Sequence, residues 1–422
     1  MIQLLPTPTY PMQCPACGTV AVGQVRFAGA VTLAETRCPV CRETYLQTVP
    51  TGQFNRFPVA VSTNGKHVRV AERGRWLVEQ VKQSGATHTR HDGSQLASVI
   101  TITGHLSATE QPVSPILLVC LDTCFGHALL MLFNAQRHHE QHPQHPIIAV
   151  VPRALAWLVP DYVAETWVVD KPLSALRGNV PGFDAVVKQQ LTRFQTVWFS
   201  RAQIHFGHRR TRFTDFTRTQ QFNLNQFDRG AVRCVTFVLR EDRLWLRFGW
   251  ERLLYRACHR VGLLSKTRSF WVRWQVRRYR QLARYLQQTY PAIQVSVTGL
   301  TSGKPTGFGD GIEDQRLWAP LSVEQERSWC AQYARSQVVV GVHGSGMLLP
   351  TSLAAGFVNL LPPDKLPHYA EDILLAHDNP IHQTLLGRFL ATSTSPKEVA
   401  TVVSSMLTEF PVWLAEARER GR

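Results

Sequence analysis

Residues 338–347 read VVVGVHGSGM, a run of β-branched residues that ends in a glycine-rich turn. The run predicts a strand buried on both faces, as in a parallel sheet. Gly344 and Gly346 allow a sharp turn after it, so that backbone N–H groups and the start of a helix can face an anion. We therefore predict a phosphate-binding loop at the carboxyl end of a parallel strand, where open α/β sheets bind ligands. A tight turn without a ligand is the alternative. A serine-hydrolase elbow is excluded, because it needs glycine where His343 and Met347 stand.

The segments around this turn alternate between apolar strands and helices. A capping box at Ser322 and Gln325 starts a helix that runs to about Arg335. In the first half of the chain, two apolar runs enclose a predicted helix at 125–137. Two sets of this kind predict an α/β fold with two Rossmann-like domains that face a cleft. The main predicted strands are 116–121 and 147–151, then 233–239, 293–299, 338–342 and 357–361.

Changes in composition along the chain predict its domain organisation. The last segment is apolar and helical, and we expect its helix to end just before Pro411. Residues 207–230 are polar and weakly periodic, as an interdomain connection would be. The predicted parts are a zinc ribbon at 1–50, a small β-rich adjunct at 51–113, an N-terminal Rossmann-like domain at 114–225, a C-terminal Rossmann-like domain at 226–395 and a C-terminal helical segment at 396–422.

Four of the nine cysteines have the spacing of a metal site. Cys14, Cys17, Cys38 and Cys41 form two Cys-Pro-x-Cys turns separated by 20 residues. Four thiolates leave no open position on a tetrahedral ion, so we predict a structural zinc site rather than a catalytic one. Two disulfides in a secreted protein are the alternative. The remaining cysteines lack metal spacing and are expected to be free thiols.

Length and charge narrow the class of protein. With 422 residues, 44% hydrophobic and 18% charged, the chain is neither disordered nor a small disulfide scaffold. Its apolar runs are too short to span a bilayer, and residues 1–12 lack the pattern of a secretory signal, so we expect a cytoplasmic protein. The net charge is +16, of which +10 lies between Arg240 and Arg284 (13 Lys or Arg against three acidic residues). Such a block attracts anions of several kinds.

The glycine-rich turn and its surroundings resemble the donor-site signature of family 61 glycosyltransferases. That family typically shows a Val-Gly-x-His-Gly-Ala-Gly-Leu core, from which this chain departs at Ser345 and Met347. The following stretch 355–362 fits the same signature. Phe125-Gly-His127 resembles a second element of the family, and the strand that ends at Arg240 resembles the position of an arginine that binds the donor phosphates.

The resemblance implies a GT-B fold and inverting transfer of a sugar from a nucleotide-sugar donor, usually without a metal. It also implies an acceptor hydroxyl on a glycan or a lipid-linked glycan, as in polysaccharide biosynthesis. We expect Arg240 and residues His343, Gly344, Ser345 and Gly346 to bind the donor. Such a reaction needs a base, and Asp122 and His127 flank the turn after the first strand of the N-terminal domain. Either of them fits that role, and each is also an ordinary helix-start residue.

The rival hypothesis is a nucleic-acid-binding protein that uses the zinc ribbon and the basic, aromatic segment 240–284. Nucleic acid is the less favoured partner, because the sequence has no helix-turn-helix or RNP motif and its aromatic residues fit helix burial. The same basic segment also fits peripheral contact of the enzyme with an anionic membrane surface, as a lipid-linked acceptor would need.

Overall fold

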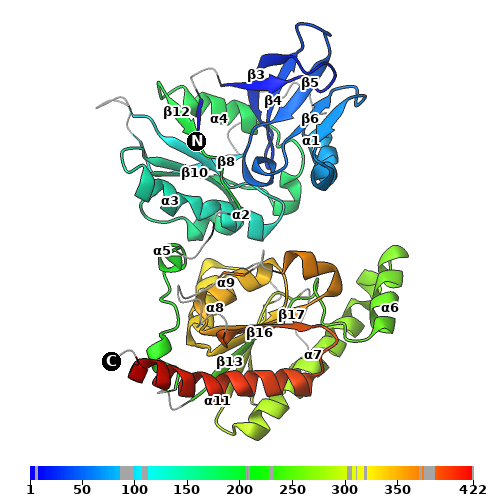
Figure 1. Ribbon diagram of the computed structural model, residues 1–422, viewed down its shortest axis with the longest axis vertical. Coiled ribbons are helices and arrows are strands. Elements are labelled where there is room, and N and C mark those ends of the chain that lie inside the picture. Colours follow the sequence, from blue (N-terminus) through cyan, green and yellow to red (C-terminus); the bar gives the residue numbers. More distant parts are fainter. Residues whose placement is uncertain are drawn as a thin grey trace. The chain divides into compact units, whose positions relative to one another are not determined.

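The computed structural model divides the chain into two compact units, Met1–Phe206 (unit 1) and Gly207–Arg422 (unit 2), each built around its own sheets (Figure 1). The predicted connection at 207–230 lies within unit 2, so the division falls earlier than residue 225. The structure describes residues 1–4, 8–85, 99–106, 113–205, 207, 210–228, 232–301, 307–309, 311–317, 321–369, 373–374 and 385–420.

Unit 1 contains a six-stranded sheet with the order β1-β12-β9-β10-β11-β8. The four central strands are parallel, and β1 and β8 join the edges antiparallel. Numbered in chain order, the parallel strands lie 4-1-2-3, so the direction of winding reverses between β9 and β12. The strands are β1 (Ile2–Leu4), β8 (Ile100–Thr103), β9 (Ile116–Val119), β10 (Ile147–Pro152), β11 (Glu165–Val169) and β12 (Val197–Phe199).

Two short helices replace the single helix predicted at 125–137. They are α2 (Phe125–Leu132) and α3 (Asn134–Gln141), which meet at Phe133. The side-chain amide of Asn134 donates to the carbonyl oxygen of Met131 at 2.9 Å, and to that of Gln203 at 2.8 Å. Asn134 therefore supplies a hydrogen-bond donor to a carbonyl oxygen in the last turn of α2, and it also links the junction of the two helices to the chain after β12. A further helix of unit 1, α4 (Phe183–Leu191), buries Phe183, Val187 and Leu191 in the same hydrophobic core as Leu117 of β9.

The N-terminal residues form a second sheet of unit 1, an antiparallel meander of β2 to β7. It continues across residue 50, so the predicted ribbon and adjunct share one sheet. Its inner residues Phe27 and Tyr45 belong to the same hydrophobic core as Leu117 of β9 and Trp167 of β11. The elements are β2 (Thr9–Gln13), β3 (Val20–Phe27), β4 (Thr32–Arg37), β5 (Thr44–Thr48), β6 (Val59–Ser62) and β7 (Val68–Val70), with the 3-10 helix η1 (Gly52–Asn55) before β6 and helix α1 (Val78–Gly85) after β7.

Unit 2 contains one six-stranded, fully parallel sheet with the order β15-β14-β13-β16-β17-β18. In chain order this is 3-2-1-4-5-6, the order of the doubly wound dinucleotide-binding fold. The winding reverses between β13 and β16. The strands are β13 (Cys234–Val238), β14 (Gln294–Thr298), β15 (Ile312–Asp314), β16 (Val338–Val342), β17 (Gly356–Leu361) and β18 (Gly387–Ala391).

Helices cover both faces of this sheet. On one face, α7 (Leu264–Thr289) and α11 (Pro396–Arg420) pack on Phe237 and its neighbours. On the other, α8 (Val323–Arg335) contributes Gln332, which donates to the hydroxyl of Thr236 at 2.9 Å. The described residues of unit 2 also form the helices α5 (Phe213–Thr217), α6 (Gly249–Arg260) and α9 (Leu348–Leu353) (Figure 1).

The prediction that the last helix ends before Pro411 is wrong, because α11 continues to Arg420. Phe410 and Leu414 on either side of the proline are both buried in the core of unit 2. Their burial holds the helix together where the proline removes one backbone hydrogen bond. The helix is thus part of unit 2 rather than a separate segment.

The structure confirms the predicted α/β class, with a parallel sheet in each half of the chain and a β-rich N-terminal part. That two such domains face a cleft stays a prediction. None of the helices in the described residues has both the length and the apolar character that crossing a bilayer demands.

Candidate functional site

The first candidate site lies in unit 2, at the carboxyl ends of β13 and β16. These strands are neighbours in the sheet, yet the chain winds away from them in opposite directions. The loops that follow them therefore border the crevice where α/β sheets of this order bind ligands. Arg240 and Arg243 lie in the loop after β13, and His343–Gly346 follow β16.

Two arginine side chains lie against the glycine-rich turn. Arg240 Nη1 lies 3.4 Å from Ser345 Oγ, and Arg243 donates from Nη1 to the carbonyl oxygen of His343 at 3.3 Å. A Cβ atom at Gly344 would lie 2.7 Å from the guanidinium carbon of Arg243, and one at Gly346 would lie 2.7 Å from Arg240 Nη1. Gly344 also has a φ of 147°, which favours glycine. The missing side chains at 344 and 346 thus let two guanidinium groups reach this turn.

Asp242 holds Arg240 in this position. Arg240 donates from Nε to Asp242 Oδ1 at 2.8 Å and from Nη2 to Oδ2 at 2.6 Å. Burial opposes ionisation of this carboxyl, but the hydrogen bonds and the charge of Arg240 outweigh it and lower the pKa of Asp242. A bidentate pair of this kind fixes the plane of the guanidinium. It leaves Nη1 as the nitrogen nearest to Ser345.

The side chain of His343 is fully buried. Its Nε2 lies 3.3 Å from the carbonyl oxygen of His368, in the 3-10 helix η8 (Pro363–His368) that follows β17. The predicted helix after the turn is short: the 3-10 helix η7 (Ser345–Met347) leads into the six-residue α9. The arginine side chains, rather than a long helix dipole, therefore supply most of the positive charge at this turn.

A second candidate site lies in unit 1, after β9. Asp122 accepts a hydrogen bond from the backbone N–H of Cys124 at 2.7 Å, and its Oδ1 lies 3.4 Å from His127 Nδ1. The side-chain amide nitrogen of Gln53 lies 3.1 Å from His127 Nε2. A carboxylate on one ring nitrogen orients an imidazole and favours a lone pair on the other nitrogen. Asp122 and His127 thus form a pair suited to proton transfer.

The second sheet of unit 1 brings Gln53 to this position. The N–H of Gly52, at the start of η1, donates to the carbonyl oxygen of Arg201 after β12 at 3.0 Å. Gly52 has a φ of 55°, and a Cβ atom there would lie 2.7 Å from the sulfur of Met131. Helix η1 therefore packs at the reversal point between β9 and β12, the position that corresponds to the arginine site of unit 2.

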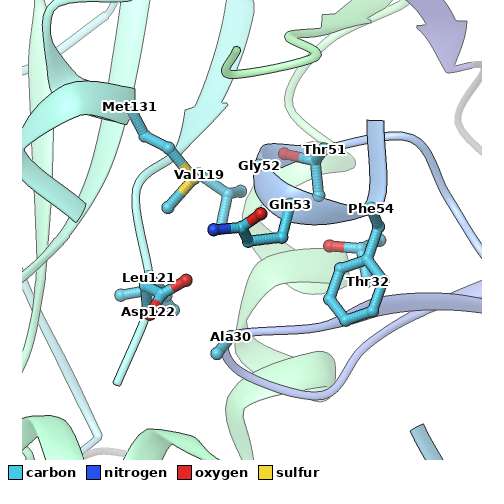
Figure 2. Close-up of a pocket in the computed structure, with 10 residues that line it drawn as sticks. All are labelled: Ala30, Thr32, Thr51, Gly52, Gln53, Phe54, Val119, Leu121, Asp122 and Met131. Atoms are coloured by element: carbon cyan, nitrogen blue, oxygen red, sulfur yellow. The ribbon is translucent and has the colours of Figure 1, made fainter. Parts of the chain in front are cut away.

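A small pocket opens between η1 and the chain after β9. Its lining comes from the second sheet and η1 on one side and from β9 and α2 on the other (Figure 2). Thr51 is 5% exposed, and its hydroxyl has no hydrogen-bond partner within the described residues. A buried hydroxyl without a partner favours a bound polar group. The lining residues are Ala30, Thr32, Thr51, Gly52, Gln53, Phe54, Val119, Leu121, Asp122 and Met131.

The four cysteines with metal spacing come together at one end of the second sheet. Cys14 and Cys17 lie between β2 and β3, and Cys38 and Cys41 between β4 and β5. Their Sγ atoms all lie within 4.8 Å of one another, with the pairs Cys14–Cys41 and Cys17–Cys38 at 3.5 Å. These separations are far longer than a disulfide bond and suit four thiolates around one ion. The cluster could therefore bind a metal.

The two turns that carry the cysteines have matching backbones. The N–H of Gly18 donates to the carbonyl of Cys14, and that of Arg42 to the carbonyl of Cys38, both at 3.0 Å. Both donors have a positive φ. Hydrogen bonds with Thr19 lower the pKa of Cys17 to about 6, which favours the thiolate that binds metals.

The structure brings the predicted residues together in three groups: Arg240 with the turn 343–346, Asp122 with His127, and the four cysteines. The sequence analysis missed Arg243, Gln53 and Thr51. Arg243 follows Arg240 by three residues in a stretch already noted for its charge. No signal in the sequence marks Gln53 or Thr51, because their position depends on how η1 packs on β9 and β12.

No family model matches the sequence, and no curated protein matches it significantly. Among solved structures, the chain is similar to one described as the E. coli ADP-heptose lps heptosyltransferase II. The two align with a TM-score of 0.38 and 15% identity, over 70% of this chain and 99% of that chain. A likeness this low does not indicate what the present chain does.

Proposed function

We propose that this protein is an inverting glycosyltransferase that moves a sugar from a nucleotide-sugar donor to a hydroxyl of a glycan or lipid-linked acceptor. The observation that carries the proposal is the pair of guanidinium groups against the glycine-rich turn, at the reversal point of the 3-2-1-4-5-6 sheet. This position and this charge fit the diphosphate of a nucleotide sugar.

On the donor side, Arg240 and Arg243 would contact the diphosphate, together with the backbone of His343–Gly346. Negative charge grows on the leaving diphosphate as the bond to the sugar breaks, so donors held in advance lower the barrier. Asp242 holds Arg240 before the ligand arrives, which reduces the reorganisation needed. Because two guanidinium groups supply positive charge, we propose that catalysis needs no added divalent cation.

On the acceptor side, we propose His127 as the base and Asp122 as the residue that positions it. The acceptor oxygen attacks the anomeric carbon on the face opposite the diphosphate, its proton passes to His127 Nε2, and the diphosphate leaves with the electron pair of the broken bond. Gln53 now contacts Nε2 and would yield that place to the acceptor hydroxyl. The polar lining from Gln53, Thr51 and Asp122 suits a sugar hydroxyl.

We propose that the four-cysteine cluster holds one structural Zn²⁺. Tetrahedral Zn–S bonds of about 2.3 Å place sulfur atoms roughly 3.8 Å apart, near the separations between these cysteines. Four protein ligands leave no position for substrate. The metal would stabilise the sheet that carries η1.

A panel of nucleoside diphosphates in a thermal shift assay tests the donor site. We expect one of them to raise the unfolding temperature of the full chain. Arg240→Ala should remove most of this shift, whereas the control Arg153→Ala, at an exposed arginine of unit 1, should keep it. If no nucleoside diphosphate stabilises the protein while single-stranded DNA does so in a salt-dependent manner, the nucleic-acid hypothesis replaces this one.

A further inference from the structure

Helix α6 lies at the edge of unit 2 and, together with the start of α7, forms a hairpin (Figure 1). Of the 12 residues of α6, only Glu251 is buried. The hairpin nevertheless carries large apolar side chains, and several are more than half exposed: Trp250 at 52%, Leu253 at 68% and Val261, just after the helix, at 66%. A soluble surface rarely keeps so many neighbouring apolar side chains in water without a partner.

These side chains form one stripe along α6. At about 100° per residue, Trp250, Leu253, Leu254 and Val261 fall within one sector of the helix. The neighbouring sector carries the basic side chains, which are Arg252, Arg256, His259 and Arg260, and Arg260 adjoins Leu253. Helix α6 therefore has an exposed apolar stripe and an adjoining basic stripe. The apolar stripe touches α7 through Trp250, whose ring centroid lies 6.3 Å from that of Trp274.

A separate set of contacts fixes α6 to α7. Glu251 is fully buried, forms an ion pair with Arg278 of α7 and accepts a hydrogen bond from the indole of Trp274 at 2.7 Å. Tyr255 packs edge-on against Trp271, with ring centroids 5.4 Å apart. Because these contacts occupy a third side of α6, the apolar stripe is exposed on an anchored helix. Phe270 of α7, which is 44% exposed, extends the apolar surface.

Apart from the buried Glu251, the hairpin carries only basic charged residues. Between Arg252 and Arg273 the sequence has no Asp or Glu and six Lys or Arg residues: Arg252, Arg256, Arg260, Lys266, Arg268 and Arg273. Arg268 forms an ion pair with Glu241. The other five basic residues concentrate positive charge beside the apolar stripe.

We propose that this hairpin docks on the surface of an anionic membrane, with the apolar stripe of α6 inserted among the lipid headgroups and the arginines on lipid phosphates. An apolar stripe with Trp and Leu that is bordered by Arg is typical of helices that lie in a membrane interface, because the arginines can then reach the lipid phosphates beside the inserted stripe. A second copy of the chain fits less well, because a symmetric contact would place like charges together. Nucleic acid would leave the aliphatic side chains in water, since Leu253 and Val261 have no ring to stack on a base.

Sedimentation of the full chain with vesicles tests this surface, independently of the glycosyl-transfer proposal. We expect binding to phosphatidylcholine vesicles that contain phosphatidylglycerol, and much weaker binding to phosphatidylcholine alone. Arg256→Ser with Arg260→Ser should weaken binding by about 25-fold, since each basic residue near the surface contributes roughly a factor of five. Leu253→Ser with Leu254→Ser should weaken it by about tenfold or more.

Matched controls separate this surface from general charge and hydrophobicity. Val412→Ser removes a side chain that is 60% exposed on α11, and Arg284→Ser with Arg327→Ser removes two exposed arginines elsewhere on unit 2. Both controls should bind vesicles like the wild type. The proposal is overturned if the wild type does not bind anionic vesicles, or if the leucine variant binds them equally well. It is also overturned if the leucine variant abolishes a dimer of the free protein, or if the arginine variant instead abolishes binding to single-stranded DNA.

Discussion

The substitution Gly346→Ala tests the donor site without removing a charge. Its new Cβ atom would lie 2.7 Å from both Cδ and Nη1 of Arg240. Ordinary contacts between such atoms are about 3.5 Å or longer, so the guanidinium must move by roughly 1 Å. Nη1 is already 3.4 Å from Ser345 Oγ, and this movement takes it out of hydrogen-bond range. The arginine keeps its charge and its partner Asp242 but no longer lies against the turn.

The expected effect follows from the loss of one charged contact to the diphosphate. A hydrogen bond to a charged group contributes about 1.5–3 kcal/mol. At 1.4 kcal/mol for each factor of ten, the affinity for the nucleoside diphosphate should fall by about 10- to 150-fold. Arg240→Ala, which removes the charge as well, should weaken binding at least as much.

Isothermal titration calorimetry with the best nucleoside diphosphate of the panel measures this effect. Gly178→Ala is the matched control, because a Cβ atom at Gly178 would have no neighbour within 4 Å. Circular dichroism should show the same fold for both variants. If Gly346→Ala binds the nucleotide as tightly as the wild type while Arg240→Ala does not, the position of Arg240 on the turn is irrelevant to binding. If both variants bind normally, the donor site lies elsewhere.

Three further predictions concern other parts of the chain. Cys38→Ser should release the zinc ion that we propose for the cysteine cluster, and it should lower the unfolding temperature of unit 1 only. Metal analysis and calorimetry measure these effects, with Cys258→Ser as the control. Retention of zinc by Cys38→Ser would refute the site. His127→Ala should lower turnover by about 10²- to 10⁴-fold and leave nucleotide affinity unchanged, and normal turnover would remove it as the base. Glu251→Gln should lower the free energy of unfolding by about 3–5 kcal/mol at neutral pH. Burial opposes the ionisation of Glu251, but hydrogen bonds from Arg278 and from backbone and indole N–H groups outweigh it and lower its pKa. Its contribution is therefore present above its ordinary pKa of 4.5 and is lost on acidification, so denaturant titrations of wild type and variant should converge as the pH falls below that value.

The central parallel strands were predictable because each carries its own signal, whereas the edge strands β15 and β18 were not predicted. Strand β16 lies at 338–342 as predicted, since a run of valines has no amphipathic alternative and must be buried on both faces. The capping box at Ser322 likewise starts α8, with Gln325 N–H bonded to the Ser322 hydroxyl. The sequence also allowed the prediction that Arg240 lies near the turn 343–346, because both follow strands of one predicted sheet.

Features that depend on packing between distant segments were not predictable. The sequence breaks near residue 50 suggested a boundary, yet β5 and β6 pair across it and the core continues into the parallel sheet. Local propensity alone ends a helix at Pro411, whereas the burial of Phe410 and Leu414 carries it onward. Gln53 reaches His127 only because η1 packs at the reversal point of another sheet.

The parallel sheet of each unit has a point where the direction of winding reverses, and different residues occupy that point in the two units. In unit 2, two glycines leave room there for two arginine side chains to reach the turn. In unit 1, the segment Thr51–Asn55 packs at the equivalent point. This segment follows β5, and β5 begins directly after the turn that carries Cys38 and Cys41. One strand therefore joins the cysteine cluster at its start to the residues of the pocket at its end. If the proposed metal is bound at the first end, it restrains the strand that leads to Thr51 and Gln53 at the second. Under the proposed function, a site with no place for substrate would then still help to position the residues that meet the acceptor.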